Sequence, residues 1–234
     1  MCALLQHGER RVHGASDKIG GPHQGLHGAS HVSTNHALIL IGFQNDYFAP
    51  NGVLRNVMEN GDRNDQVVSR TVSLIRSLMD TSVTMLAAPI IFTDDYKELR
   101  QADGILAAIK DSGALREGRE GAGVIDELHE FSDRIIEVPG KRGLNAFSNT
   151  TLARELISHD ITDVAIAGAG TSIWVDSTGR TAYQMGYRVN ILADCISART
   201  SMEQDIFCSK VFPTYASVVD STAYLESIRR NMTG

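Results

Sequence analysis

The stretch from Asp163 to Arg180, DVAIAGAGTSIWVDSTGR, limits the possible folds more than any other part of the chain. It begins as a short apolar run, breaks at Gly168–Gly170 and then starts a helix, with Thr171 and Ser172 as candidate caps. A strand that turns through glycines into a helix is typical of an open α/β sheet, where ligands bind beyond the carboxyl ends of the strands. An enzyme of this class can carry its nucleophile at the first helical residues, where this chain has Trp174.

Apolar runs alternate with segments of helical spacing along the rest of the chain. Strands are predicted at 37–41, 82–91, 134–138, 163–168, 187–193 and 217–219. Helices are predicted at 64–80, 124–130, 148–159, 174–185, 200–211 and 221–230, with 96–120 as a polar, partly helical insertion over the sheet edge. This alternation predicts one α/β domain over residues 36–234, with a six-stranded, mainly parallel sheet covered on both faces as three α/β/α layers.

The bulk composition excludes several classes of partner. The net charge of −6 argues against nucleic acid or an anionic membrane as the main partner, because both require a basic face. No apolar run approaches the roughly 20 residues of a transmembrane helix. Three cysteines without metal or redox spacing favour a cytoplasmic location. A dinucleotide fingerprint is also missing, because Gly168–Gly170 lacks a third glycine in register, and no cofactor is predicted.

Residues 1–35 differ from the rest, since they are rich in glycine and histidine and lack hydrophobic periodicity. A flexible N-terminal extension is the simplest interpretation. Metal binding is a weaker alternative, because the histidines lack fixed ligand spacing and carboxylate partners. A third alternative is an arm that packs on a neighbouring subunit or covers a pocket. The histidines concerned are His7, His13, His23, His27 and His31.

Three separated motifs resemble the isochorismatase-like family, the cysteine-hydrolase fold that includes nicotinamidases, carbamoylsarcosine amidohydrolases and isochorismatases. They are ALILIGFQNDYF at 37–48, KRGLNAFSNT at 141–150, and GAGTSIWVDSTGRTA at 168–182, the last followed by GYRV at 186–189. The resemblance covers about residues 36–230 and places the motifs at the ends of the first, third and fourth strands. It implies the three-layer fold of that family, a small-molecule substrate or ligand and a homo-oligomer.

The hydrolases of this family use an Asp as base, a Lys that holds the thiolate and a Cys nucleophile, with backbone N–H groups at the helix start receiving the oxyanion. The resemblance assigns these three positions to Gly42, Lys141 and Trp174, so that only the lysine is kept. Isochorismatases without the Cys still need the Asp, which Gly42 cannot replace. The family's metal sites use histidines near the second strand, and 92–96 has none, so no metal is predicted.

The two substitutions change volume in opposite directions. Glycine at 42 removes a side chain from the pocket, and Trp174 adds an indole that we expect to fill much of the cavity and stack near Gly42. Overpacking costs about 1–3 kcal/mol, so a matching deletion would make the tryptophan tolerable. Lys141 then lacks both of its family partners. It can turn to solvent or to a carboxylate such as Asp46, bind an anionic ligand, or act as a base or imine-forming amine of low pKa.

The other residues of the matched segments have two interpretations each. Tyr47, Asn145 and Phe147 are candidate substrate-binding residues or simple packing residues, and Gly170 and Ile173 complete the predicted ligand lining. In the insertion, Phe92 and Tyr96 are expected to form an apolar wall for a ring-bearing ligand. Helix capping and helix-face hydrogen bonding are favoured over a nucleophilic role for Ser172 and Ser177, and a structural ion pair is predicted for Asp176 with Arg180.

Three functional hypotheses follow from these substitutions. The first is a relative that has lost the hydrolase triad and uses its small-molecule pocket for non-hydrolytic chemistry, such as a cyclisation or rearrangement steered by Trp174 and Lys141. The second is a catalytically silent protein that binds a ligand or pairs with an active homologue. The third is an amide hydrolase with displaced catalytic residues. A preformed cavity holding Trp174 and Lys141 would favour the first, and a filled pocket with an exposed apolar interface the second.

Overall fold

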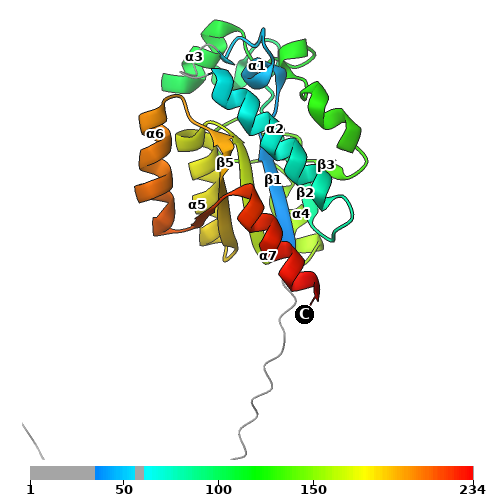
Figure 1. The fold of residues 1–234 in the computed structure, drawn as a ribbon. Coiled ribbons are helices and arrows are strands. Elements are labelled where there is room, and N and C mark those ends of the chain that lie inside the picture. The colour runs from blue at the N-terminus through cyan, green and yellow to red at the C-terminus, as the bar shows by residue number, and fades with distance from the viewer. Residues whose placement is uncertain (1–34, 56–60, 234) are drawn as a thin grey trace, which may run out of the picture. The chain divides into compact units, whose positions relative to one another are not determined.

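A computed structural model describes residues 35–55 and 61–233, and six strands in this part of the chain form one sheet (Figure 1). The strand order is β3-β2-β1-β4-β5-β6, and every neighbouring pair is parallel. The predicted six-stranded sheet is therefore confirmed. Its strands are β1 (His36–Ile41), β2 (Thr84–Ala88), β3 (Ile135–Glu137), β4 (Asp163–Ala169), β5 (Arg188–Ser197) and β6 (Ser217–Val219).

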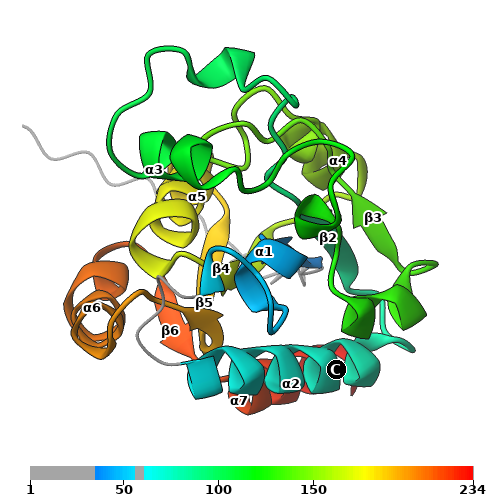
Figure 2. The same cartoon turned by 90° about the horizontal axis from the view of Figure 1, so that it is seen from above.

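Helices cover both faces of the sheet, which gives the predicted three layers. In Figure 2, α2 and α7 lie together along one face, and α4 and α5 lie on the other. The helices are α1 (Asn45–Phe48), α2 (Gly61–Leu78), α3 (Gly104–Ser112), α4 (Leu152–Ser158), α5 (Asp176–Gln184), α6 (Ser201–Ile206) and α7 (Ser221–Thr233). Shorter helical segments have 3₁₀ or π geometry. The 3₁₀ segments are η2 (Lys97–Leu99), η3 (Glu120–Ala122), η4 (Asp126–Phe131) and η7 (Phe212–Thr214), and the π segments are η5 (Thr171–Val175) and η6 (Phe207–Val211).

The central strands β1 and β4 are buried along nearly their whole length, as their uninterrupted apolar sequences predict. Their close approach depends on Gly168, since a Cβ atom there would lie 1.9 Å from the carbonyl oxygen of Ile41. The chain runs from β1 outward to β2 and β3, then returns to place β4 on the other side of β1. The strand order reverses between β1 and β4, and ligands of open α/β sheets bind beyond such a point.

Several boundaries differ from the sequence-based expectation. Helix α4 begins at Leu152 instead of Ser148, because Asn149 adopts a left-handed conformation (φ +59°) that interrupts the helix. The helix predicted at 124–130 is the 3₁₀ segment η4. The helix predicted at 200–211 is α6 followed by the wider turn η6. Strand β5 runs on to Ser197, so that Cys195 lies within the strand.

Two further predictions concern the N-terminal residues and membrane-spanning helices. Residues 1–34 of the predicted N-terminal extension, with its five histidines, fall outside the described residues. None of the helices in 35–55 and 61–233 has the length and apolar character needed to cross a membrane.

Candidate functional site

The three positions that correspond to the family triad meet at the carboxyl edge of the sheet. Gly42 directly follows β1, and Trp174 lies in η5, just after the neighbouring strand β4. Lys141 follows β3, and its backbone pairs with that of Ile90 beyond β2. The fold therefore brings together the segments that the motifs identify.

The indole of Trp174 is packed into the protein, with only 2% of the residue exposed. It lies directly against Gly170, where an added Cβ atom would come within 1.9 Å of the indole Cε3. The Tyr47 ring meets it edge-on, with 5.6 Å between the ring centroids. The backbone of Gly170, at φ +76°, thus makes room for the indole.

The ring of Tyr47 is the nearest neighbour of Gly42. A Cβ atom at Gly42 would lie 3.6 Å from the Tyr47 ring and 3.8 Å from the Cβ of Ala169. The expected burial of Trp174 agrees with the structure, and the indole packs against the same Tyr47 ring. The hydroxyl of Tyr47 and the Nε1 of Trp174 are both buried without a hydrogen-bond partner among the described residues.

Lys141 is fully buried beside the indole. Its Nζ lies 5.7 Å from the centroid of the Trp174 ring and donates a hydrogen bond to the carbonyl oxygen of Gly143. Among the described residues it forms no ion pair. Burial lowers the pKa of Lys141 well below that of an ordinary lysine.

The predicted alternative in which Lys141 turns to solvent or to Asp46 is wrong. The Asp46 carboxylate instead accepts the backbone N–H of Leu115 at 2.6 Å and packs against Gly121. That contact comes from the insertion, more than 60 residues along the chain, and no local pattern announces it. Anion binding by Lys141 and chemistry of its uncharged amine stay hypotheses.

The last three backbone N–H groups of η5 are already engaged. Those of Ile173, Trp174 and Val175 all donate to the carbonyl oxygen of Gly170, at 3.0, 2.9 and 3.3 Å. Gly170 itself donates to the carbonyl oxygen of Ser197. These N–H groups therefore point back into the turn and not toward a reacting carbonyl group.

A buried glutamine that the sequence-based reasoning did not single out connects the site to the insertion. The side chain of Gln44, fully buried, accepts the N–H of Ile90 at 2.7 Å and donates to the carbonyl oxygens of Ile90 and Ala122 at 2.9 and 2.8 Å. Next to it, Asn45 donates to the carbonyl oxygen of Glu120. A run of three polar residues directly after a buried strand was the available signal for this role.

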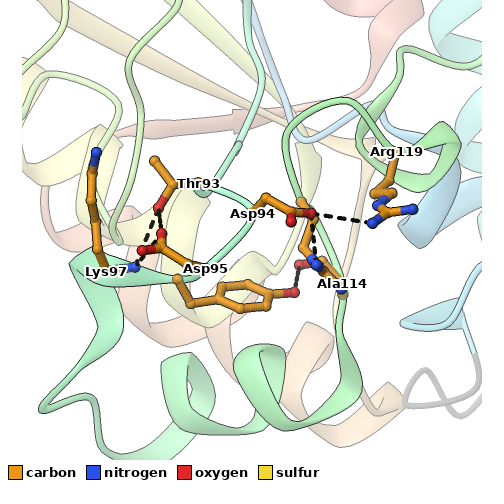
Figure 3. Close-up of polar contacts among 8 residues, drawn as sticks. Thr93, Asp94, Asp95, Lys97, Ala114 and Arg119 are labelled. Carbon is orange, nitrogen blue, oxygen red and sulfur yellow. Dashed lines mark hydrogen bonds and ion pairs between the residues drawn. The ribbon is translucent and has the colours of Figure 1, made fainter.

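The insertion is held over the sheet edge by charged contacts (Figure 3). Asp94 pairs with Arg116 at 2.6 Å and with Arg119 at 3.4 Å, and the guanidinium of Arg116 lies over the Tyr96 ring. The Tyr96 hydroxyl donates to the carbonyl oxygen of Ala114 at 2.6 Å, and Figure 3 shows the contacts of Asp94 and Ala114 as dashed lines. Glu98 joins this segment to Arg142, beside Lys141.

The proposed ring-binding wall in this insertion is part of the core. Phe92 and Tyr96 lie together, with ring centroids 6.1 Å apart, but both are buried. Their rings therefore support the loop from inside.

The other predicted lining residues make hydrogen bonds and packing contacts within the domain. Asn145 donates to the Thr181 hydroxyl and accepts the N–H of Phe147, and Phe147 and Ile173 pack partly buried against the core. The predicted ion pair between Asp176 and Arg180 is present at 2.8 Å. No side-chain cap starts η5; its Thr171 hydroxyl donates instead to Gln204 of α6.

Neither described free cysteine has the properties of a displaced nucleophile. Cys195 is fully buried, and its burial raises the pKa of its thiol to about 12. Burial also raises the pKa of Cys208. Within the described residues, no group of three or more His, Cys, Asp or Glu side chains could hold a metal ion.

The order of the strands, the helices on both faces and the three motifs at the carboxyl edge define a three-layer α/β/α domain of the cysteine-hydrolase type. Residues 36–223 match the sequence profile of the Isochorismatase domain. The chain belongs to the isochorismatase family.

Known proteins of this family resemble the chain at modest identity. The isochorismatase family protein YwoC of Bacillus subtilis (strain 168) is 29% identical over 89 residues, which is 38% of this chain and 47% of YwoC, so the match spans about half the length of that relative. The isochorismatase-like hydrolase from Alkaliphilus metalliredigens is 18% identical with a TM-score of 0.70, covering 83% of this chain and 99% of that one. Nicotinamidase PncA from Bacillus subtilis is 23% identical with a TM-score of 0.64, covering 80% and 100%. These two structures share the fold with this chain.

Proposed function

We propose that this protein is a catalytically silent member of the isochorismatase family that binds a ligand or pairs with another protein. The observation that carries the proposal is the closed state of the triad positions. Lys141 is fully buried and Trp174 is 2% exposed, so an amide substrate would have no route to either side chain. The hydrolytic machinery is also missing, because Gly42 has no side chain to act as a base and the indole cannot act as a nucleophile.

Non-hydrolytic chemistry, such as a cyclisation or rearrangement steered by Trp174 and Lys141, is the competing hypothesis. It requires a preformed cavity between these side chains. Four hollows on the described surface are lined by other residues. The burial of Lys141 and Trp174 favours the silent alternative. The lowered pKa of Lys141 favours non-hydrolytic chemistry, because a lysine that acts as a base or forms an imine needs an uncharged amine.

Two buried donors at the closed positions have no partner among the described residues. They are the Tyr47 hydroxyl and the Trp174 Nε1, and each such group costs about 1–3 kcal/mol. An amide hydrolase with displaced residues is disfavoured, because the thiol of Cys195 has its pKa raised to about 12 by burial.

The proposal is tested by measuring hydrolysis of simple amides, nicotinamide among them, by the native protein and by the double variant Gly42→Asp/Trp174→Cys. We expect no turnover by the native protein. A Cβ atom at position 42 meets only ordinary contacts, but φ is +65°, so the aspartate would carry about 1 kcal/mol of strain or more. Activity in the double variant alone would support the loss of the triad on an intact scaffold, whereas native turnover would refute the proposal.

The single variants are the matched controls for this experiment. Gly42→Asp alone lacks the thiol, and Trp174→Cys alone lacks the base, so neither should gain activity. Circular dichroism establishes that each variant is folded. The homo-oligomer and the cytoplasmic location stay predictions, which size-exclusion chromatography with light scattering and cell fractionation would address.

A further inference from the structure

A hollow lies at the opposite edge of the sheet from Lys141 and Trp174. It has a volume of about 680 Å³, within the usual range for small-molecule sites. Its lining comes from the first residues of β4, β5 and β6, the end of α5 and the turn before β6. Neither the family resemblance nor the proposed function assigns a role to this amino-terminal edge.

Three tyrosines form the walls of the hollow. Tyr183, Tyr187 and Tyr215 all line it, and Tyr183 is 54% exposed, which is unusual for a large aromatic residue. The rings of Tyr183 and Tyr215 lie 6.2 Å apart at a tilt of 54°. A flat ring entering the hollow would meet aromatic surfaces that are already in place.

Tyr215 is fixed in position before any ligand arrives. Its hydroxyl donates to the Asp176 carboxylate at 3.2 Å, and the guanidinium of Arg180 lies 5.0 Å from its ring centroid. Arg180 and Asp176, which both contact Tyr215, also form an ion pair with each other. An aromatic wall held in this way loses little side-chain entropy on binding.

A cation lies at one end of the hollow. The Arg188 guanidinium is held side-on by Asp163, with its Nε and one Nη donating at 2.7 and 2.6 Å. The other Nη has no hydrogen-bond partner in the described part of the chain. The arginine side chain is 61% exposed, and that of Asp163, which also lines the hollow, is only 9% exposed, so the cation is the more accessible of the two charges.

We propose that this hollow binds a small aromatic carboxylate, whose ring lies among Tyr183, Tyr187 and Tyr215 and whose carboxylate accepts from Arg188. The complementarity is of two kinds, aromatic and electrostatic. Arginine beside a carboxylate gives a charge-assisted hydrogen bond, which is about twice as strong as a neutral one. This site does not depend on the proposed function, because it lies at the other edge of the sheet.

The test is a calorimetric titration of the full chain with 2-naphthoate, compared with 2-naphthamide, which has the same ring system without the charge. We expect naphthoate to bind about tenfold more tightly than the amide. Tyr183→Ala should weaken naphthoate binding about three- to tenfold, and this exposed position tolerates the change. Arg188→Gln should reduce binding to the level of the amide.

Arg154→Gln is the matched control, because Arg154 is exposed on α4 and pairs only with its neighbour Glu155. It should leave naphthoate binding unchanged. Arg188→Gln also removes an ion pair, so its melting temperature is measured in parallel. The proposal is overturned if the amide binds as tightly as the carboxylate, if Tyr183→Ala has no effect, or if naphthoate does not bind. The comparison of the two ligands and the Tyr183→Ala result decide this even if Arg188→Gln does not fold.

Discussion

At the scale of single residues, Lys141 is the group whose environment departs most from its ordinary one. Burial lowers its pKa in the folded protein, whereas the unfolded chain keeps a value near 10.4. Between these two values the unfolded state binds a proton that the folded state lacks. The free energy of unfolding should therefore rise with pH through this window, by at most about 1.4 kcal/mol per pH unit.

Lys141→Met should remove this pH dependence and raise stability at neutral pH, because a buried apolar side chain has no proton to exclude. Urea unfolding at a series of pH values between about 7 and 10 would measure it. Lys97→Met, at an exposed lysine, is the control and should keep the native slope. Equal slopes in the native protein and Lys141→Met would show that Lys141 is not buried.

Gly170 is the second residue with a sharp prediction. Gly170→Ala should destabilise the protein by about 2–4 kcal/mol, since the Cβ atom adds backbone strain at φ +76° to a collision with the indole. Gly113→Ala is the matched control, with φ +72° and open space around its Cβ position, so it reports the strain alone.

A double-mutant cycle separates the two contributions. In a Trp174→Ala background, Gly170→Ala should cost no more than Gly113→Ala, because the collision partner has been removed. Chemical unfolding of the four proteins gives the coupling free energy. If Gly170→Ala is as costly without the indole as with it, the indole does not lie against Gly170.

At the scale of elements, the end of β1 and the insertion behave as one unit through Gln44. Gln44→Met keeps the shape of the side chain but leaves buried groups of Ile90 and Ala122 unpaired, at an expected cost of about 2–4 kcal/mol. Amide hydrogen exchange in residues 90–123 should accelerate more than elsewhere. Asn45→Ala, which removes an exposed hydrogen bond to Glu120, should cost under about 1 kcal/mol. Uniform acceleration across the domain would argue against a local role.

The sequence predicted strands better than helix ends, for a physical reason. A run such as Ala37–Ile41 has one plausible use, as a strand buried on both faces, and it forms β1. The start of α4 lies after Asn149, which adopts φ +59°. A single residue with a left-handed backbone leaves no periodic signal in the sequence.

At the scale of the whole molecule, the motifs predicted which segments lie together but not how their side chains pack. Gly42 and Trp174 follow the neighbouring strands β1 and β4, and Lys141 follows β3 and pairs with Ile90 beyond β2. The path of the Lys141 side chain was not predictable, because Asp46 is occupied by the backbone of Leu115 from the insertion. The burial of Phe92 and Tyr96 likewise depends on how the insertion closes over them, which is a long-range packing outcome.

Lys141 and Trp174 form a closed, packed core at the carboxyl edge of the sheet, and the intrinsic fluorescence of Trp174 can test this closure. Trp174 is the only tryptophan, so its fluorescence reports this site alone. Quenching of that fluorescence by acrylamide measures the access of a small polar molecule to the indole. We predict that the native protein is quenched far less than the same protein unfolded in urea, because 2% of Trp174 is exposed. Equal quenching in the two states would show that the indole lies open to solvent and would contradict the account.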